Sequence, residues 1–124
     1  MKTIFTLLTF IFFISINAYA SDVPKIQCSG TEPFWDISIN ESGVLSLGDP
    51  SNGDEKIYSR TILKSMERTS STYTLNIEAR DEANGLLNLN VQKEICDDGM
   101  SEEIYPYSVS VNIKGRIFKG CCNL

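Results

Sequence analysis

The widest range of reactive side chains in this chain lies in one stretch, CDDGMSEEIYPY, at positions 96–107. Its four carboxylates could supply oxygen ligands to a calcium ion, or two of them could form a hydrolytic site if held at a defined separation. The alternating acids of a dedicated calcium loop are absent, and consecutive acids direct their side chains apart. A structural interpretation also fits, because Asp98-Gly99 is a turn pair and Pro106 suits an edge strand. We therefore expect a braced corner here, ahead of a metal loop.

Most other catalytic chemistry is missing from the sequence. The chain has no histidine, which removes histidine-based acid–base catalysis, the usual serine triad and imidazole metal sites. It also lacks the CxxC redox motif, the Walker loop and the dinucleotide fingerprint. We predict a protein that is not an enzyme and carries no cofactor, with a carboxylate-dependent hydrolase as the least favoured alternative.

The first twenty residues have the features of a secretory signal peptide. Lys2 precedes an apolar run over 4–16, and the segment closes on the small-x-small pattern of Ala18-Tyr19-Ala20. The run is too short for a membrane-spanning helix. We expect residues 1–20 to be removed and residues 21–124 to form a single exported, periplasmic β domain with no membrane span.

The charge of the exported part excludes some partners. Sixteen acids and, without Lys2, ten bases give residues 21–124 a net charge of −6. Such a surface repels nucleic acid and anionic lipids, and it favours a basic partner. The same charge also serves solubility.

The exported part alternates between apolar and polar residues with the period of β-strands. We expect Leu87, Leu89, Val91 and Ile95 to share one inward face. The segments predict seven or eight short strands in a small antiparallel barrel, with a β-sandwich as the alternative. After a first strand that contains Ile26 and Cys28, the expected strands cover 34–39, 44–47, 57–63, 73–79, 86–95, 105–113 and 116–122.

Four cysteines in an exported domain are expected to form two disulfides. If Lys114-Gly115 is a two-residue hairpin turn, Cys122 points inward and Cys121 points outward. By the same alternation Cys28 points inward and Cys96 outward. The predicted pairs are Cys28–Cys122 and Cys96–Cys121, which contribute about 4–5 and about 3 kcal/mol in the chain-entropy model.

Trp35 is the single tryptophan and lies at the start of a predicted inner face. It could form the floor of a pocket for a small apolar ligand, as small barrels allow. A lone tryptophan in a small domain more often fills the core, and we expect that role. A carrier of a small apolar ligand or a metal ion, using Trp35 or the loop 97–103, stays an alternative function.

Two segments together resemble an uncharacterised family of bacterial envelope proteins. The segments are CSGTEPFWDISI (28–39) and CDDGMSEEIYPYSVSVNIKGRIFKGCC (96–122). The family is marked by GTEPFW and by C-x-D-G-M-S-D-x-x-Y-P with a closing G-C. Here Glu102 replaces the usual aspartate, and the sequence lacks the lipobox of lipoprotein members. The matching positions are Gly30, Thr31, Glu32, Pro33, Phe34, Trp35, Cys96, Asp98, Gly99, Met100, Ser101, Tyr105, Pro106, Gly120 and Cys121.

The resemblance implies an exported protein without an assigned activity. Its size and strand content are similar to those of inhibitors of c-type lysozyme and META-type domains, which is a likeness of fold only. We predict a monomeric, non-catalytic binding or interaction module, with a basic enzyme such as lysozyme as one partner class. The candidate binding residues from the motifs are Thr31, Glu32, Phe34, Trp35, Asp98, Met100, Ser101 and Tyr105.

Overall fold

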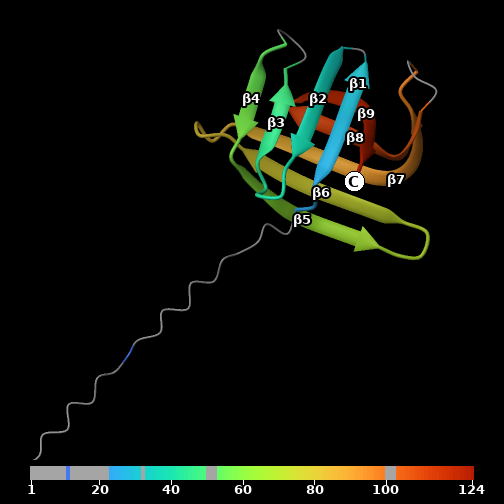
Figure 1. Cartoon of the computed structure of the whole chain (residues 1–124), viewed down its shortest axis with the longest axis horizontal. Coiled ribbons are helices and arrows are strands. Elements are labelled where there is room, and N and C mark those ends of the chain that lie inside the picture. The colour runs from blue at the N-terminus through green and yellow to red at the C-terminus, as the bar shows by residue number, and fades with distance from the viewer. Residues whose placement is uncertain (1–10, 12–22, 32, 50–52, 100–102) are drawn as a thin grey trace, which may run out of the picture.

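The computed structural model describes residues 11, 23–31, 33–49, 53–99 and 103–124, and these form an all-β structure (Figure 1). Nine strands are present in this part of the chain, every neighbouring pair antiparallel, in one sheet of order β4-β3-β2-β1-β9-β8-β7-β6-β5. The strands are β1 (Ile26–Thr31), β2 (Phe34–Ile39), β3 (Leu45–Gly48), β4 (Glu55–Tyr58), β5 (Arg60–Arg68), β6 (Tyr73–Arg80), β7 (Leu86–Asp97), β8 (Ile104–Ile113) and β9 (Arg116–Asn123).

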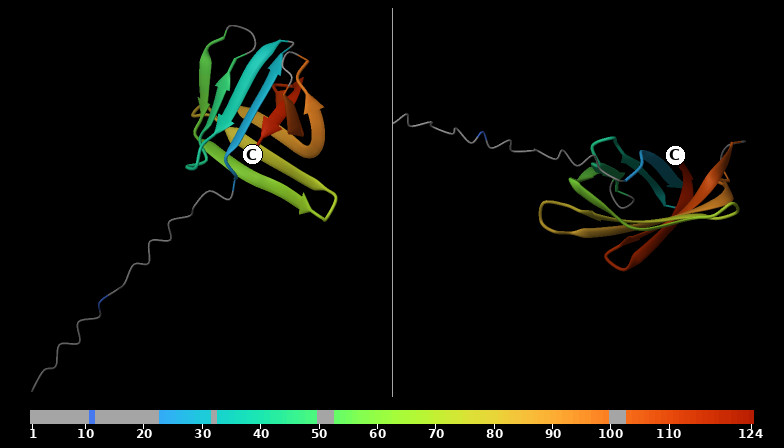
Figure 2. Two further views of the ribbon diagram at one scale, coloured as in Figure 1. Left: turned by 45° about the vertical axis from the view of Figure 1, so that its right-hand side comes forward. Right: turned by 90° about the horizontal axis from the view of Figure 1, so that it is seen from below.

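The sheet curls into a nearly closed barrel because its first and last strands pair with each other. In the β1–β9 ladder, Cys28 lies opposite Cys122. Figure 2 shows the sheet curling so that β1–β4 face β5–β7 across the core. The predicted barrel is confirmed, but the strand number is higher than expected, because the run 57–63 is divided by Ser59 between β4 and β5.

The predicted alternation of side chains holds in the C-terminal hairpin. Tyr107 lies opposite Cys122 and Val111 opposite Phe118. Lys114 and Gly115 have φ angles of 51° and 82°, which fit a two-residue turn with positive φ at both positions. That turn sets the register, and the register places alternate side chains of β8 and β9 in the core.

Trp35 is 2% exposed and belongs to the hydrophobic core, as expected. Its indole ring lies over two glycines on neighbouring strands. A Cβ atom at Gly30 would collide with Nε1 of Trp35, and one at Gly120 would collide with the backbone carbonyl oxygen of Ser29 and would lie 2.7 Å from Cζ2 of the indole ring. The two glycines therefore leave the space that the indole fills. Gly30, Trp35 and Gly120, which belong to the two motif segments, pack together in the core.

The barrel remains unpaired between β4 and β5, and polar contacts hold this seam. Lys56 of β4 forms an ion pair with Asp81 in the β6–β7 turn, with Nζ 3.3 Å from Oδ2. The amide of Gly85 donates to Oδ1 of Asp81 at 2.6 Å. On the other side, the hydroxyl of Thr61 in β5 donates to the carbonyl oxygen of Gly43 at 2.7 Å. The Lys56–Asp81 and Thr61–Gly43 contacts join segments that no strand ladder connects, and the Gly85 amide holds the Asp81 carboxylate in place.

Within the described residues, no helix has the length and hydrophobicity required to cross a lipid bilayer.

We expect the Gly30→Ala substitution to lower the free energy of unfolding by about 1–3 kcal/mol, because the added methyl group overpacks the core against Trp35. The Trp35→Phe substitution should destabilise by leaving a cavity. In the double variant the smaller ring makes room for the methyl group, so the combined loss should be less than the sum. Denaturant unfolding of the four proteins measures this coupling; additive losses would show that the collision is absent.

The ion pair at the seam should make the free energy of unfolding depend on pH both in acid and in base. The Gly85 amide, and then Lys56, hold the pKa of the Asp81 carboxyl below its ordinary value. Its contribution to stability is therefore complete at neutral pH and is lost as the pH falls from about 4 through the folded-state pKa. The pKa of Lys56 is raised, first by Tyr58 and also by Asp81, so its contribution is lost as the pH rises through that pKa.

Unfolding measured by denaturant from pH 7 to pH 3 tests this seam. The Asp81→Asn variant should be less stable at neutral pH and should lose less stability on acidification than the wild type. Glu78→Gln is the control for the location of the effect: the pKa of Glu78 is also lowered, first by Lys64, but its ion pairs with Lys64 and Arg80 lie on β5 and β6, away from β4. Hydrogen exchange in β4 should increase in the Asp81 variant and not in the control. Unchanged β4 exchange in both would contradict the role of the ion pair.

Candidate functional site

A bulge in β7 produces the bend from which the candidate site is built. The β7–β8 register shifts between Lys93 and Cys96, and Pro106 of β8 lies opposite this shift. The expectation of an edge strand at Pro106 is wrong, because β8 is paired with both β7 and β9, and the proline is accommodated at the bulge instead. Ile95 is 79% exposed, so the expectation that it shares the inward face of Leu87 is wrong. A bulge adds one residue to a strand and reverses the facing of the residues beyond it.

The bend carries the end of β7 to the outer side of β9, where Cys96 is bonded to Cys121. The second disulfide joins Cys28 and Cys122 in the core. Both pairings agree with the sequence prediction, and no described cysteine is free. Cys121 is only 2% exposed although it is on the outer side of the barrel, because the end of β7 lies against it.

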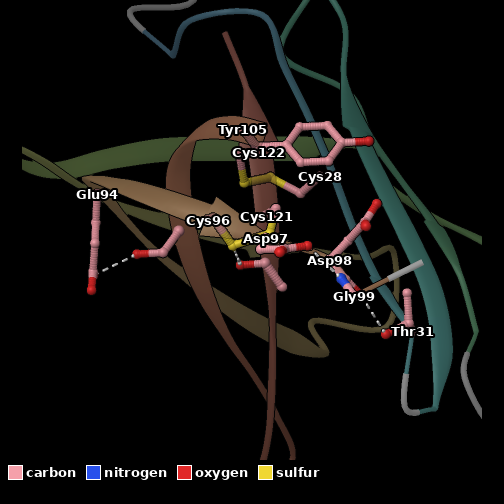
Figure 3. The surroundings of a disulfide bond; sticks show 12 residues. Cys28, Thr31, Glu94, Cys96, Asp97, Asp98, Gly99, Tyr105, Cys121 and Cys122 are labelled. Atoms are coloured by element: carbon pink, nitrogen blue, oxygen red, sulfur yellow. Dashed lines mark hydrogen bonds between the residues drawn. A yellow bond between two sulfur atoms is a disulfide. The ribbon is translucent and has the colours of Figure 1, made fainter. Parts of the chain in front are cut away.

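Between the bent end of β7 and strands β1, β8 and β9 lies a concave site of 470 Å³, which we call the disulfide hollow. Its walls come from β7, β8 and β9, which are consecutive along the chain, and from β1, which is far from them in sequence. The Cys96–Cys121 disulfide forms part of its surface (Figure 3). The lining residues are Ser29, Gly30, Thr31, Asn90, Gln92, Glu94, Cys96, Asp97, Asp98, Ser108, Val109, Ser110, Lys119, Gly120 and Cys121.

The hollow brings together residues from both motif segments. The hydroxyl of Thr31, at the end of β1, donates to the carbonyl oxygen of Asp98 at 3.2 Å. Figure 3 shows Asp98 between Thr31 and Asp97. The amide of Gly99 donates to Oδ1 of Asp97 at 2.8 Å, as in an Asx turn. The stretch 96–99 is thus held by the disulfide, by Thr31 and by its own turn, and it forms one wall of the hollow. The corner was predicted for 96–107, of which residues 100–102 lie outside the described residues.

The remaining candidate residues have different positions. Phe34 is 67% exposed at the start of β2, and Trp35 is in the core. Tyr105 is half-buried in β8, and its hydroxyl is 3.3 Å from Oε2 of Glu103. The structure therefore places Thr31 and Asp98 in the hollow and the other three elsewhere. The candidates Glu32, Met100 and Ser101, together with Glu102, lie outside the described residues.

The charge of the lining is predominantly negative. Glu94, Asp97 and Asp98 contribute carboxylates, and Lys119 is the one base among the lining residues. Glu94 is exposed and accepts a hydrogen bond of 3.1 Å from the hydroxyl of Ser108. These carboxylates are near solvent and within reach of a ligand that enters the hollow. Such an arrangement can bind a cationic group through charge-assisted hydrogen bonds.

Sequence reasoning missed the polar residues that form most of the surface of the hollow. Asn90 and Gln92 of β7 and Ser108 and Ser110 of β8 point away from the core, at alternate positions with the buried Val91 and Val109. The signal was present, because asparagine is depleted in strands. Neighbouring amides also bond to one another, since Nδ2 of Asn90 donates to Oδ1 of Asn76 at 2.6 Å.

Within the described residues, no group of three or more acidic, cysteine or histidine side chains is arranged to hold a metal ion. Two of the four carboxylates in the opening motif, Asp97 and Asp98, lie in the hollow, and Glu103 lies outside its lining.

No protein-family model matches this chain, no curated protein is significantly similar to it, and no solved structure matches it. The resemblance to the envelope family therefore stays a prediction.

Removal of the outer disulfide should open the hollow while the barrel persists. We expect the Cys96→Ser/Cys121→Ser variant to lose about 3 kcal/mol of unfolding free energy, since a loop of moderate length is released. Hydrogen exchange should increase most in the segments 94–99 and 103–106. The comparison variant Cys28→Ser/Cys122→Ser should lose about 4–5 kcal/mol and exchange faster throughout the barrel. A uniform increase in the first variant would contradict a local role.

Proposed function

We propose that this protein is an exported, non-catalytic binding module that holds a cationic segment of a partner protein in the disulfide hollow. The observation that carries the proposal is the hollow itself, a concave site of 470 Å³ with three carboxylates and one base in its lining. Concave sites with a few convergent polar groups are the usual places where proteins bind ligands.

Two features support an extracytoplasmic location. Disulfides form and persist in oxidising compartments, and all four cysteines of this chain are paired. The N-terminal signal-peptide pattern predicts export to the periplasm. A periplasmic module of this charge would meet basic enzymes in the same compartment, and a basic lysozyme is a suitable representative of that class.

Binding is favoured over catalysis by the chemistry of the lining. The carboxylates of Glu94 and Asp97 already accept hydrogen bonds from Ser108 and Gly99. The other contacts are offered by amides and hydroxyls, which orient a ligand but do not exchange protons readily at neutral pH. The surface therefore supplies recognition groups rather than an evident general acid and base.

The apolar-carrier alternative has less support. Trp35, which would form the floor of the pocket in that alternative, is buried in the core and packs against Gly30 and Gly120. The charged and polar lining of the disulfide hollow suits a cationic ligand better than an apolar one.

Binding of a basic c-type lysozyme at low and at high salt tests the proposal. We expect association at low ionic strength that weakens as salt is added, because exposed charges are screened. The Glu94→Gln/Asp97→Asn variant should bind about tenfold more weakly, mainly through a slower association rate. These substitutions keep acceptor oxygens for the local hydrogen bonds and remove only the charge.

The matched control is Glu41→Gln/Glu82→Gln, which removes the same charge from exposed positions outside the hollow. It should bind nearly as well as the wild type. If no association is measurable at low salt, or if both variants lose affinity equally, the proposed use of the hollow is wrong.

A further inference from the structure

A second hollow of 530 Å³ lies at one end of the barrel, between the β5–β6 turn and strands β7 and β8. We call it the mouth hollow. Figures 1 and 2 show the β5–β6 hairpin extending on the same side of the barrel as the bend of β7. Its lining contains two cations, two tyrosines and three hydroxyl side chains: Arg68, Lys93, Tyr73, Tyr107, Thr69, Ser70 and Thr72.

The sheet register places the two cations at core-facing positions. Lys93 lies two residues beyond the buried Val91 and opposite Tyr107. Arg68 lies opposite Tyr73, which is two residues from the buried Leu75. Positions two apart share a face of the sheet, so both basic residues continue the core-facing rows of their strands, but they lie beyond the end of the core and their side chains are exposed.

The tyrosines between these cations form one aromatic unit. The rings of Tyr73 and Tyr107 are 5.8 Å apart at an interplanar angle of 61°. Both are half-buried and pack against the hydrophobic core, so their positions are fixed by the barrel. The mouth hollow therefore has an aromatic floor held by the core, with charged side chains at its sides.

The cations are not neutralised by neighbours. Across the described segments, neither Arg68 nor Lys93 takes part in an ion pair, and the mouth hollow has no carboxylate in its lining. The adjacent Glu94 directs its carboxylate to Ser108 on the opposite face. In a chain with sixteen acids and eleven bases, two unpaired bases around a carboxylate-free hollow are an exception to the overall charge.

We propose that the mouth hollow binds an acidic oligosaccharide. Arg68 and Lys93 would each pair with a carboxylate of the sugar chain. They belong to β5 and β7, whose backbones are about 10 Å apart across the intervening strand, so the two side chains suit repeated rather than single charges. The tyrosine rings offer flat surfaces for the C–H faces of a sugar. The Ser70 hydroxyl and the hydrogen-bonded hydroxyl pair of Thr69 and Thr72 give the hollow a polar edge for the hydroxyls of the sugar.

An oligogalacturonate, with a neutral maltooligosaccharide of the same length as the reference, tests this site. Titration followed by NMR should shift the amides of residues 68–73, 93 and 107 with the acidic sugar and not with the neutral one. The Arg68→Gln/Lys93→Gln variant should bind about tenfold more weakly or worse, since charge-assisted hydrogen bonds are lost. The control Lys25→Gln/Lys114→Gln removes equal charge outside the mouth hollow and should retain the affinity.

Circular dichroism verifies that each variant is folded. If the Arg68→Gln/Lys93→Gln variant does not fold, the amide shifts of the wild-type protein with the acidic and the neutral sugar decide the question. Shifts outside the mouth hollow, or equal binding of the neutral sugar, would overturn the proposal. Equal binding of inorganic phosphate, or binding to phosphatidylglycerol vesicles that the double variant loses, would also overturn it, in favour of a simple anion or a lipid headgroup. Because the disulfide hollow is a separate surface, lysozyme binding can fail without affecting this result.

Discussion

The pairing of β1 with β9 is the constraint on which the rest of the structure depends. The other described ladders join strands that are consecutive along the chain, so each forms at a small cost in loop entropy. The β1–β9 ladder brings together Cys28 and Cys122, which are 94 residues apart in sequence. That contact curls the meander into a barrel and places β1 next to the bent end of β7. Without the β1–β9 ladder, Gly30 and Gly120 would not lie together beside Trp35, and the disulfide hollow would lack the wall that β1 provides.

The two disulfides have different structural roles, one in the barrel and one at the disulfide hollow. The inner one fixes the closure of the barrel, and the outer one fixes the direction in which β7 continues after its bulge. Since Cys121 and Cys122 are adjacent in a strand, they face opposite sides and connect both structures through one peptide bond. The core and the disulfide hollow are therefore directly connected at the end of β9.

Much of this architecture could be predicted because strand alternation is a local property. The facing of Cys121 and Cys122 followed from a two-residue turn at Lys114-Gly115, and matching it with the facing expected for Cys28 and Cys96 gave both disulfides. The bulge interrupts the alternation used for Cys96, so that pairing was correct although the alternation does not extend to this residue. The prediction for Ile95 failed because a bulge breaks the period of two without a clear sequence signal. The hollow was missed for the same reason: its concavity arises from that bend. The mouth hollow was missed because Arg68 and Lys93 are far apart in sequence, and only the pairing of β6 with both β5 and β7 brings them to the same hollow.

The seam between β4 and β5 lies opposite the point where the two ends of the barrel sequence meet. The start of β1 and the end of β9 lie side by side, with Gln27 opposite Asn123, whereas β4 and β5 form no ladder with each other and follow one another in the chain through Ser59. A circular permutant joined near residues 26 and 123 and opened at Ser59 would run from β5 to β9 and then from β1 to β4. Every ladder would then be a local hairpin, and Cys28–Cys122 would become a short-range link. The relative contact order of the domain would fall without any change in its contacts, so folding should accelerate.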